Sequence, residues 1–250
     1  MNTYTTTEIA KIIGIHPNTV RFYEKWKLIP KVERKENGYR IFTDFHIDQF
    51  RLARTALQVE ILQNGLRKKA VNIIKTSANR DFIKAICMTE EYLSQIQQER
   101  FNAEEAIEIV KNLLSKKENF NSISLKRKEV SDYLNISMDT LRNWELNGLL
   151  DIKRKQNGYR IYTGEDIVRL KIIRSLRCAN YSLSAILRML NALSENPDID
   201  IKNVIDVPKE DDDIITACDK LITSLNSAEE NANFILSHLK EMNKKYNPPF

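Results

Sequence analysis

Two stretches of the chain have apolar residues spaced as in short helices that bury one face. Residues 8–29 read EIAKIIGIHPNTVRFYEKWKLI, and residues 129–150 read EVSDYLNISMDTLRNWELNGLL. Each stretch predicts two short helices, and Gly14 or Asn135 ends the first of them because both residue types tolerate left-handed backbone. The stretches align at an offset of 121 residues, so the chain contains an internal repeat.

The polar residues before these helices predict where each helix begins. We expect Thr6 or Thr7 to cap the first helix of copy one, and its second helix to begin near Pro17 or Asn18. In copy two we expect Asp139 to cap the second helix. Helix two would then follow helix one closely in both copies.

A second repeated motif follows each helix pair. NGYRIFT occupies residues 37–43 and NGYRIYT occupies 157–163. The Asn-Gly pair that opens each motif predicts a two-residue hairpin between short apolar strands. A further helix is expected to begin near Asp44 and near Glu165. Two helices followed by a hairpin describe a winged helix-turn-helix.

Apolar positions alternate at spacings of four and three in two longer regions, 82–114 and 214–246. This spacing predicts a coiled-coil seam in each region, with polar breaks in the first. The first seam comprises Phe82, Ile86, Thr89, Leu93, Ile96, Arg100, Ala103, Ile107, Val110 and Leu114. The second comprises Ile214, Cys218, Leu221, Leu225, Ala228, Ala232, Ile235, Leu239, Met242 and Tyr246.

Charge alternates along the chain in blocks that follow these elements. The net charge of +5 divides into +8 for residues 1–80, −3 for 81–118, +6 for 119–192 and −6 for 193–250. The two basic blocks suit a polyanion such as DNA. The three cysteines lie far apart, so no metal site is expected. No stretch is apolar enough for a membrane span, and we expect a cytoplasmic protein.

NTVRFYE and DTLRNWE, each followed by a leucine-containing turn and then by NGYRIF/YT, resemble the winged helix of MerR family transcription regulators. The resemblance covers about 65 residues of each copy. It implies a mainly α fold with two winged helix-turn-helix domains, each followed by a long coiled-coil helix, in a pseudo-twofold arrangement. It also implies that the second helix enters the major groove and that the wing approaches the DNA backbone.

Side chains at these positions form the candidate DNA-binding surface. Arg21 and Arg142 could bind guanine or a phosphate. The resemblance places Tyr23 near a phosphate, and Trp144 replaces this tyrosine in copy two. The alternative is that Tyr23 and Trp144 are core aromatics and that His16 is an ordinary helix-terminal residue. The candidates in copy one are His16, Asn18, Thr19, Arg21, Tyr23, Tyr39 and Arg40. Those in copy two are Ser137, Asp139, Thr140, Arg142, Trp144, Tyr159, Arg160 and Tyr162.

The expected domain order places one winged-helix domain and one long helix in each half. The boundaries are 1–80, the first DNA-binding domain; 81–118, the first coiled-coil helix; 119–123, a linker; 124–192, the second DNA-binding domain; 193–213, an acidic connector without clear periodicity; and 214–250, the second coiled-coil helix.

Linker length bears on how the two halves pair. The helix at 81–118 would be about 57 Å long, whereas the segment that leads into copy two spans at most about 20 Å. Family members pair such helices antiparallel, so each helix ends beside the DNA-binding domain, or head, of its partner. We therefore expect an intramolecular pseudo-dimer through helices 81–118 and 214–246, with a homodimer of chains as the alternative.

The predicted function is a sequence-specific transcription regulator. It would bind an imperfect inverted repeat in promoter DNA through two non-identical heads and distort it, with RNA polymerase as a further partner that the resemblance implies. Two rivals remain: an architectural or recombination-accessory (excisionase-like) DNA binder, and an interaction protein with one degenerate head. No cofactor is expected. An enzyme is not expected either, since no nucleophile–base pair or phosphate loop is apparent.

Overall fold

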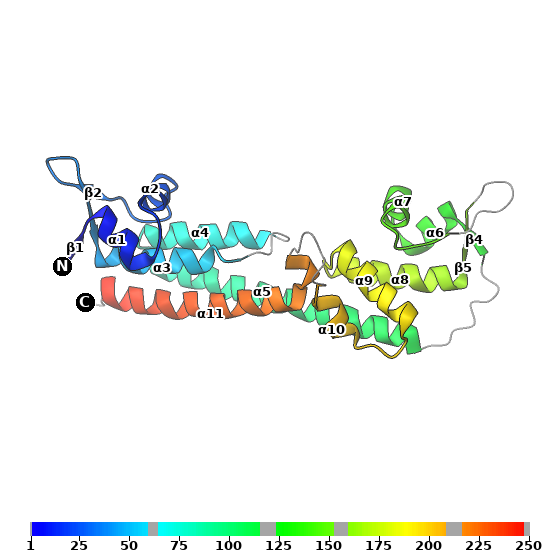
Figure 1. Cartoon of the computed structure of the whole chain (residues 1–250). Coiled ribbons are helices and arrows are strands. Elements are labelled where there is room, and N and C mark those ends of the chain that lie inside the picture. Colours follow the sequence, from blue (N-terminus) through cyan, green and yellow to red (C-terminus); the bar gives the residue numbers. More distant parts are fainter. Residues whose placement is uncertain (1, 60–64, 116–123, 153–159, 209–216, 248–250) are drawn as a thin grey trace. The chain divides into compact units, whose positions relative to one another are not determined.

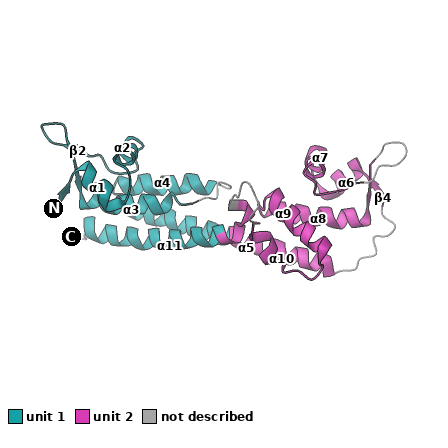
Figure 2. Ribbon diagram, in the orientation of Figure 1, with its two compact units in different colours: residues 1–98, 224–250 teal, residues 99–223 magenta. Residues whose placement is uncertain are grey.

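The fold is mainly α-helical, with short strands at the edges of two compact units. The computed structural model describes residues 2–59, 65–115, 124–152, 160–208 and 217–247 (Figure 1). Unit 1 consists of residues 1–98 together with 224–250, and unit 2 consists of residues 99–223 (Figure 2). The units therefore do not coincide with the two sequence copies, because unit 1 includes the end of copy two.

Unit 1 begins with the predicted helix pair. The elements of this head are β1 (Thr3–Tyr4), α1 (Thr6–Ile13), α2 (Pro17–Lys25), β2 (Glu33–Arg34), β3 (Arg40–Thr43), α3 (Asp44–Ala56) and α4 (Leu66–Ala78). The cap of α1 is Thr5, not Thr6 or Thr7, since Thr5 forms a reciprocal capping box with Glu8. Gly14 ends α1 with φ of 71°, the left-handed conformation that was expected.

The hairpin of unit 1 differs in detail from the expected two-residue turn. The Gly38 amide donates to the Lys35 carbonyl over 2.8 Å, and the Lys35 amide donates to the Tyr39 carbonyl over 2.8 Å. Gly38 has φ of +80°. The loop is thus one residue longer than the Asn-Gly pair alone predicts, with the glycine taking the left-handed position after a tight turn. β3 also pairs antiparallel with β1, which gives the strand order β1-β3-β2.

Apolar residues from both helices and the sheet form the core of this head. The buried cluster consists of Ile9, Ala10, Val20, Ile29, Val32, Phe42, Ile47 and Phe50. Members of this cluster come from α1, α2, β3 and α3, so burial of one apolar face holds the helix pair against the wing.

Two long helices form the base of unit 1. α5 (Phe82–Ser115) and α11 (Leu221–Tyr246) lie side by side here in Figures 1 and 2. Gln97 donates to Glu229 over 2.8 Å, and Lys240 lies 3.9 Å from Glu90. Later residues of α5 therefore meet earlier residues of α11, so the two helices run antiparallel within this unit.

The end of α11 is attached to α3 by a group of polar contacts around Asp48. Lys245 and Tyr246 donate to the Asp48 carboxylate over 2.9 and 2.7 Å, and His238 lies 2.9 Å from its backbone carbonyl. Burial would raise the pKa of Asp48, but the hydrogen bonds from Lys245 and Tyr246 hold it below its usual value. Because copy two supplies α11 and copy one supplies α3, the two copies share unit 1.

Unit 2 contains a second helix pair with a short sheet. Its elements are β4 (Ser124–Lys126), α6 (Arg127–Leu134), α7 (Met138–Leu146), β5 (Ile161–Thr163), α8 (Gly164–Cys178), α9 (Leu183–Glu195), α10 (Ile201–Asp206) and the 3-10 turn η2 (Ala217–Asp219). Asn135 ends α6 with φ of 50°, as expected. The cap of α7 is Ser137, not Asp139: its hydroxyl accepts from the Thr140 amide over 3.0 Å, so the helix begins two residues earlier.

The second half of α5 packs within unit 2. Asn180 donates to Glu99 over 3.4 Å, Tyr181 donates to the Ala103 carbonyl over 3.4 Å, and Lys202 pairs with Glu104 at 3.0 Å. Lys202 lies on α10, within the segment expected to be a connector without periodicity. Asp200 caps this short helix, and Ile201 and Ile205 bury its inner face.

The seams expected in the long helices are mostly buried. Between residues 221 and 242 every predicted position of α11 is buried, whereas α11 begins at Leu221, so Cys218 belongs to η2 and Ile214 lies outside the described residues. In α5 the pattern is broader than a single seam, because Ala85, Tyr92 and Ala106 are buried as well, while Leu114 is exposed.

None of the helices in the described part of the chain is both long and apolar enough to cross a membrane. Among the described residues, no group of three His, Cys, Asp or Glu side chains gathers in a way that could hold a metal ion. Cys87 and Cys178 are exposed, and Cys218 is buried.

Candidate nucleic-acid interface

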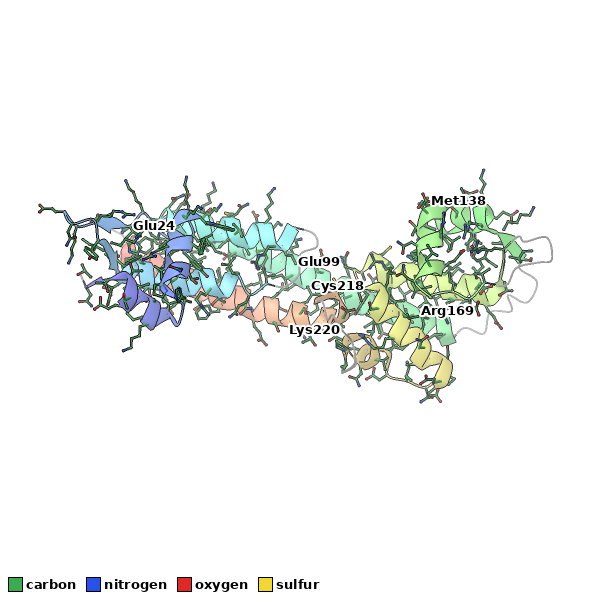
Figure 3. The ribbon with its side chains drawn as sticks, turned by 45° about the horizontal axis from the view of Figure 1, so that its top comes forward. Glu24, Glu99, Met138, Arg169, Cys218 and Lys220 are labelled. Carbon is green, nitrogen blue, oxygen red and sulfur yellow. The ribbon has the colours of Figure 1, made fainter. Side chains whose placement is uncertain are left out.

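The N-terminal parts of α2 and α7, from the cap to the fifth residue, present polar side chains to solvent. His16, Asn18 and Arg21 are exposed in copy one, and the Arg21 guanidinium donates to the Asn18 side chain over 3.0 Å. Ser137, Asp139 and Arg142 are exposed in copy two, and Thr19 and Thr140 are partly exposed. Met138, the first residue of α7, is also exposed (Figure 3). Both helix starts could therefore enter a groove.

His16 and Ser137 serve as the caps of these two helices. His16 Nδ1 accepts from the Asn18 amide over 3.2 Å, and the Ser137 hydroxyl accepts from the Thr140 amide over 3.0 Å. An N-cap satisfies an amide that would otherwise lack a partner at the helix start. The role of His16 as a helix-terminal residue is thus visible in the structure, and its side chain stays exposed beside Asn18.

A glutamate of α2 holds the wing, which is the β2–β3 hairpin, in unit 1; α2 and its counterpart α7 are the candidate recognition helices. Arg40 donates to Glu24 over 2.6 Å, and Arg34 lies 3.7 Å from the same carboxylate (Figure 3 labels Glu24). Arg34 and Arg40 pair across the hairpin, so one carboxylate ties both wing strands to α2. Arg40 therefore positions the wing relative to α2.

The matching glutamate in unit 2 has more partners and less exposure. Glu145 accepts from Arg127, Arg160 and Tyr162, with Arg160 at 3.1 Å. The Glu145 side chain is 8% exposed, against 22% for Glu24. Arg127 begins α6, so this carboxylate joins α6, α7 and β5 at one point.

The hydroxyl of Tyr162 faces inward. Tyr162 is 0% exposed, and its hydroxyl contacts Glu145 and Arg127. Burial raises the pKa of Tyr162 to about 12. A fully buried phenol cannot reach a DNA phosphate, so the expected contact of Tyr162 with DNA does not fit the structure. The apolar face of β5 turns toward the core, which is where Phe42 also lies in copy one.

The remaining aromatic candidates differ in exposure. Tyr23 is half-buried and packs against Phe50 with ring centroids 5.1 Å apart, and burial raises the pKa of its phenol. Trp144 is 5% exposed, so it lies in the core of its unit. Tyr39 is an exposed residue of the wing. Tyr159 lies outside the described residues.

Both recognition helices are also fixed by a side chain that sequence reasoning missed. Gln49 on α3 donates to the Leu28 carbonyl over 3.0 Å, and Arg169 on α8 donates to the Leu149 carbonyl over 2.6 Å. Each carbonyl lies in the turn just after the recognition helix. Gln49 and Arg169 occupy matching positions 120 residues apart, but the residue types differ. Sequence similarity between the copies therefore could not reveal the shared contact.

Two separate segments of the chain match models of one family. Residues 125–193 match the model described as "MerR HTH family regulatory protein", and residues 5–42 match "MerR family regulatory protein". These segments contain both recognition helices and both glutamates that hold the wings.

Curated relatives give the same result. The chain is 42% identical over 53 residues to the HTH-type transcriptional regulator CueR of Escherichia coli O6:H1, which covers 21% of this chain and 39% of that protein. It is 28% identical over 104 residues to CueR of Salmonella typhi, covering 38% and 72%, respectively. It is 29% identical over 65 residues to ZntR of Escherichia coli strain K12, covering 26% and 46%.

The match to the first of these relatives spans about two fifths of that relative's length. No solved structure gives a significant match to the chain. Two family-model matches on separate segments, together with the similarity to CueR and ZntR, support a MerR-family regulator.

Proposed function

We propose that this chain is a DNA-binding transcription regulator of MerR type with two non-identical heads. The observation that carries the proposal is the repeated geometry of α2 and α7. Each helix presents exposed polar side chains near its N-terminus and an exposed arginine as its fifth residue, and each is tied to a wing by a glutamate–arginine pair. A helix held rigidly with its first turn exposed is what major-groove reading requires.

The two heads are expected to read related but unequal half-sites. Asn18 and Thr19 in copy one correspond to Asp139 and Thr140 in copy two. Asp139 adds a negative charge where copy one has a neutral amide, and a carboxylate can accept from cytosine N4 but repels a nearby phosphate. The target is therefore an imperfect inverted repeat in promoter DNA, which the protein distorts so that RNA polymerase can use it.

The chain is further proposed to form its own dimer-like unit. Within unit 1, α11 from copy two runs antiparallel to α5 and ends on α3 of copy one. Within unit 2, residues Glu99, Ala103 and Glu104 of α5 from copy one contact the turn between α8 and α9 and also α10, all of copy two. Each unit thus combines a head with a long-helix segment from the other copy, which supports an intramolecular pairing of the long helices.

Analytical ultracentrifugation tests the pseudo-dimer. We expect a single chain of 29.2 kDa at micromolar concentration and one chain per DNA site. A stable dimer of chains that binds DNA with two chains per site would contradict the proposal and support the homodimer alternative.

Selection of bound sequences from random double-stranded DNA tests the function most directly. The proposal predicts an inverted repeat with two unequal halves, and footprinting should protect both. A single protected half-site would indicate one degenerate head. Binding of such a site without any effect on transcription from a promoter that contains it would support the architectural or recombination-accessory alternative.

Matched variants of the recognition helices assign the halves. Arg21→Ala should weaken binding by about 1–3 kcal/mol and relax preference in one half-site, and Arg142→Ala should do so in the other. Lys202→Gln, on the exposed surface of α10, is the control. Loss of preference in the same half-site for both variants would contradict the assignment of one helix to each half.

Variants of the wing test its proposed contact with the DNA backbone. Arg40→Ala and Arg160→Ala should each weaken binding and lower the salt dependence, by a slope of about one for each phosphate that the variant no longer neutralises. Glu24→Gln removes the tie while keeping the arginine. If Arg40 acts only through Glu24, both variants of that pair will weaken binding with unchanged salt slope.

A further inference from the structure

A hollow of 980 Å³ lies in unit 1 between the second half of α2 and α4. Its lining includes Phe22, Trp26, Lys25, Lys27 and Lys75. Phe22 is 57% exposed and Trp26 is 64% exposed, although both are large apolar side chains. A concave surface of this size, mostly apolar and with a few charged groups, has the general character of a small-molecule site.

Arg67 lines the hollow and fixes its wall on the α4 side. Its guanidinium donates to the carbonyls of Leu57 and Val59 over 2.6 and 3.0 Å. These two contacts join the start of α4 to the segment that follows α3. The hollow therefore has a fixed wall on the α4 side.

Copy two lacks the side chains that give this hollow its character. At the offset of 121 residues, Lys25, Trp26 and Lys27 correspond to Leu146, Asn147 and Gly148. The exposed face of α7 at this level thus carries no positive charge and no aromatic ring. A contact that both heads need for DNA would not be expected to depend on residues that only one head has.

Lys27 occupies a position at which glycine is the less costly residue. Its φ is +56°, and Gly148, its counterpart, has φ of +75°. Both residues end the recognition helix in the same way, with the next amide donating back to Tyr23 over 2.9 Å or to Trp144 over 3.1 Å. Left-handed backbone is unfavourable for a residue with a β-carbon. Copy one therefore accepts a conformational cost and places a lysine in the lining of the hollow.

We propose that this hollow binds a small planar aromatic anion, of the aromatic carboxylate class. The ring would lie against Trp26 and Phe22, and the carboxylate would be bound by Lys27 and Lys75. Duplex DNA keeps its base faces stacked inside the helix and offers mainly charged phosphates at its surface. Exposed aromatic rings beside lysines fit an aromatic anion better, because such a ligand uses both kinds of side chain.

The site would give the protein a regulatory input in one head only. The hollow is formed by α2, whose first turn we propose reads DNA, so a ligand there contacts the recognition helix of copy one. This consequence rests on the proposed function, whereas the binding site itself does not. Any coupling between ligand and DNA must be reciprocal.

Calorimetric titration of the full-length chain with 2-naphthoate, in the absence of DNA, tests the site. The proposal predicts saturable binding of one molecule per chain, and much weaker binding of the neutral 2-naphthamide. Lys27→Gly and Lys75→Gln should each raise the dissociation constant about tenfold, which corresponds to about 1.4 kcal/mol. Lys11→Gln, on the exposed side of α1, is the matched control and should leave it unchanged.

Two additional readouts separate a specific site from a folding effect. The chain has two tryptophans, so only the indole resonance of Trp26 should shift with the probe, while that of the buried Trp144 should not. Lys27→Gly should raise the melting temperature of unit 1 even though it weakens probe binding. Weaker probe binding in a variant with a higher melting temperature cannot then be explained by a loss of folding stability.

The proposal is overturned if no saturable binding occurs at millimolar probe, if the amide binds as well as the carboxylate, or if Lys27→Gly and Lys75→Gln bind as the unchanged protein does. Loss of DNA affinity in Lys27→Gly without any probe binding would assign the hollow to DNA and would also overturn it. A failure of DNA binding with probe binding intact would contradict the proposed function and leave this site standing.

Discussion

In both heads a glutamate ties the recognition helix to the wing, but the polar partners of that glutamate differ. In unit 1 Glu24 ties α2 to the wing through Arg34 and Arg40, and the neighbouring core position is Phe42. In unit 2 Glu145 receives Arg127, Arg160 and the hydroxyl of Tyr162. The change from Phe42 to Tyr162 adds a buried hydroxyl, and such a group needs a partner.

The Glu145 carboxylate of unit 2 is therefore less exposed than that of Glu24 and has more polar partners. Arg127 stands where copy one has Thr6, which is the second difference between the two glutamate sites. A change at one buried position is thus matched by a cation from another helix. The comparison teaches that the heads diverged in their internal polar contacts as well as in their exposed first turns.

The largest effect is expected from Glu145→Ala. It removes one partner each from two arginines and from the Tyr162 hydroxyl, and breaking a buried ion pair in this way should destabilise unit 2 by about 3 kcal/mol or more. Glu24→Ala should cost about 1 kcal/mol, because the Glu24 carboxylate is more exposed. Urea unfolding followed by tryptophan fluorescence, from Trp26 in unit 1 and Trp144 in unit 2, and by circular dichroism measures both. Equal losses for the two variants would contradict the difference between the heads.

The next effect concerns Asp48, which holds the end of α11 in unit 1, where copy two has Val168 in the matching position. Asp48→Asn should lower the free energy of opening the last turn of α11 by about 2 kcal/mol at neutral pH, since hydrogen bonds to a charged group are strong. The partners that face Asp48 are Arg51, His238, Lys245 and Tyr246. Hydrogen exchange of residues 240–247 measures the opening.

The same contact predicts a pH dependence. The pKa of Asp48 lies below its usual value in the folded chain, so the carboxylate contributes stability that is present above its unfolded pKa and is lost as pH falls through the folded pKa. The opening of α11 should therefore increase at acidic pH in the natural chain and change less in Asp48→Asn. Lys202→Gln, which breaks the exposed Lys202–Glu104 pair of unit 2, is the control and should have little effect. An equal pH response in the natural chain and in Asp48→Asn would rule out this role of Asp48.

The smallest effect is expected from exchanging the residues that end the two recognition helices. Lys27→Gly should stabilise unit 1 by about 1 kcal/mol, and Gly148→Lys should destabilise unit 2 by a similar amount, because only glycine adopts left-handed backbone without cost. No atom lies within 4 Å of the position that a β-carbon would take at Gly148, so the cost is conformational rather than steric crowding. Thermal unfolding of the two variants tests this directly. Opposite signs are required; stabilisation by both would be inconsistent with the strain at Lys27.

Much of the fold was predictable from local sequence, because helix ends and turns depend on neighbouring residues. Gly14 and Asn135 end their helices in left-handed backbone as expected, and α2 begins at Pro17. The choice between neighbouring polar caps was wrong at Thr5 and Ser137. Several residues in each stretch could cap the helix, and the one that does so depends on which amide its side chain reaches.

The candidate site was predictable in its exposed parts and less so in its buried ones. The exposed positions of Arg21 and Arg142 follow from helical spacing alone. The inward hydroxyl of Tyr162 and the contacts of Gln49 and Arg169 with the turns after the recognition helices do not. These contacts join residues 17 to 21 positions apart whose letters differ between copies, so no short motif marks them.

The sequence by itself determined that a helix pair and a hairpin motif occur twice and that two long apolar seams follow, because periodicity and turn residues act over a few positions. The family resemblance led us to expect that each long helix supports the head of the other copy but left a homodimer open, and only the tertiary structure shows which helix segments pack with which head within one chain. Residues 224–247 pack with the head of copy one, and residues 99–115 pack with that of copy two. The physical reason is that an apolar seam specifies that a helix face must be covered but not by which partner; contacts such as Lys245 and Tyr246 with Asp48, between residues nearly 200 positions apart, make that choice.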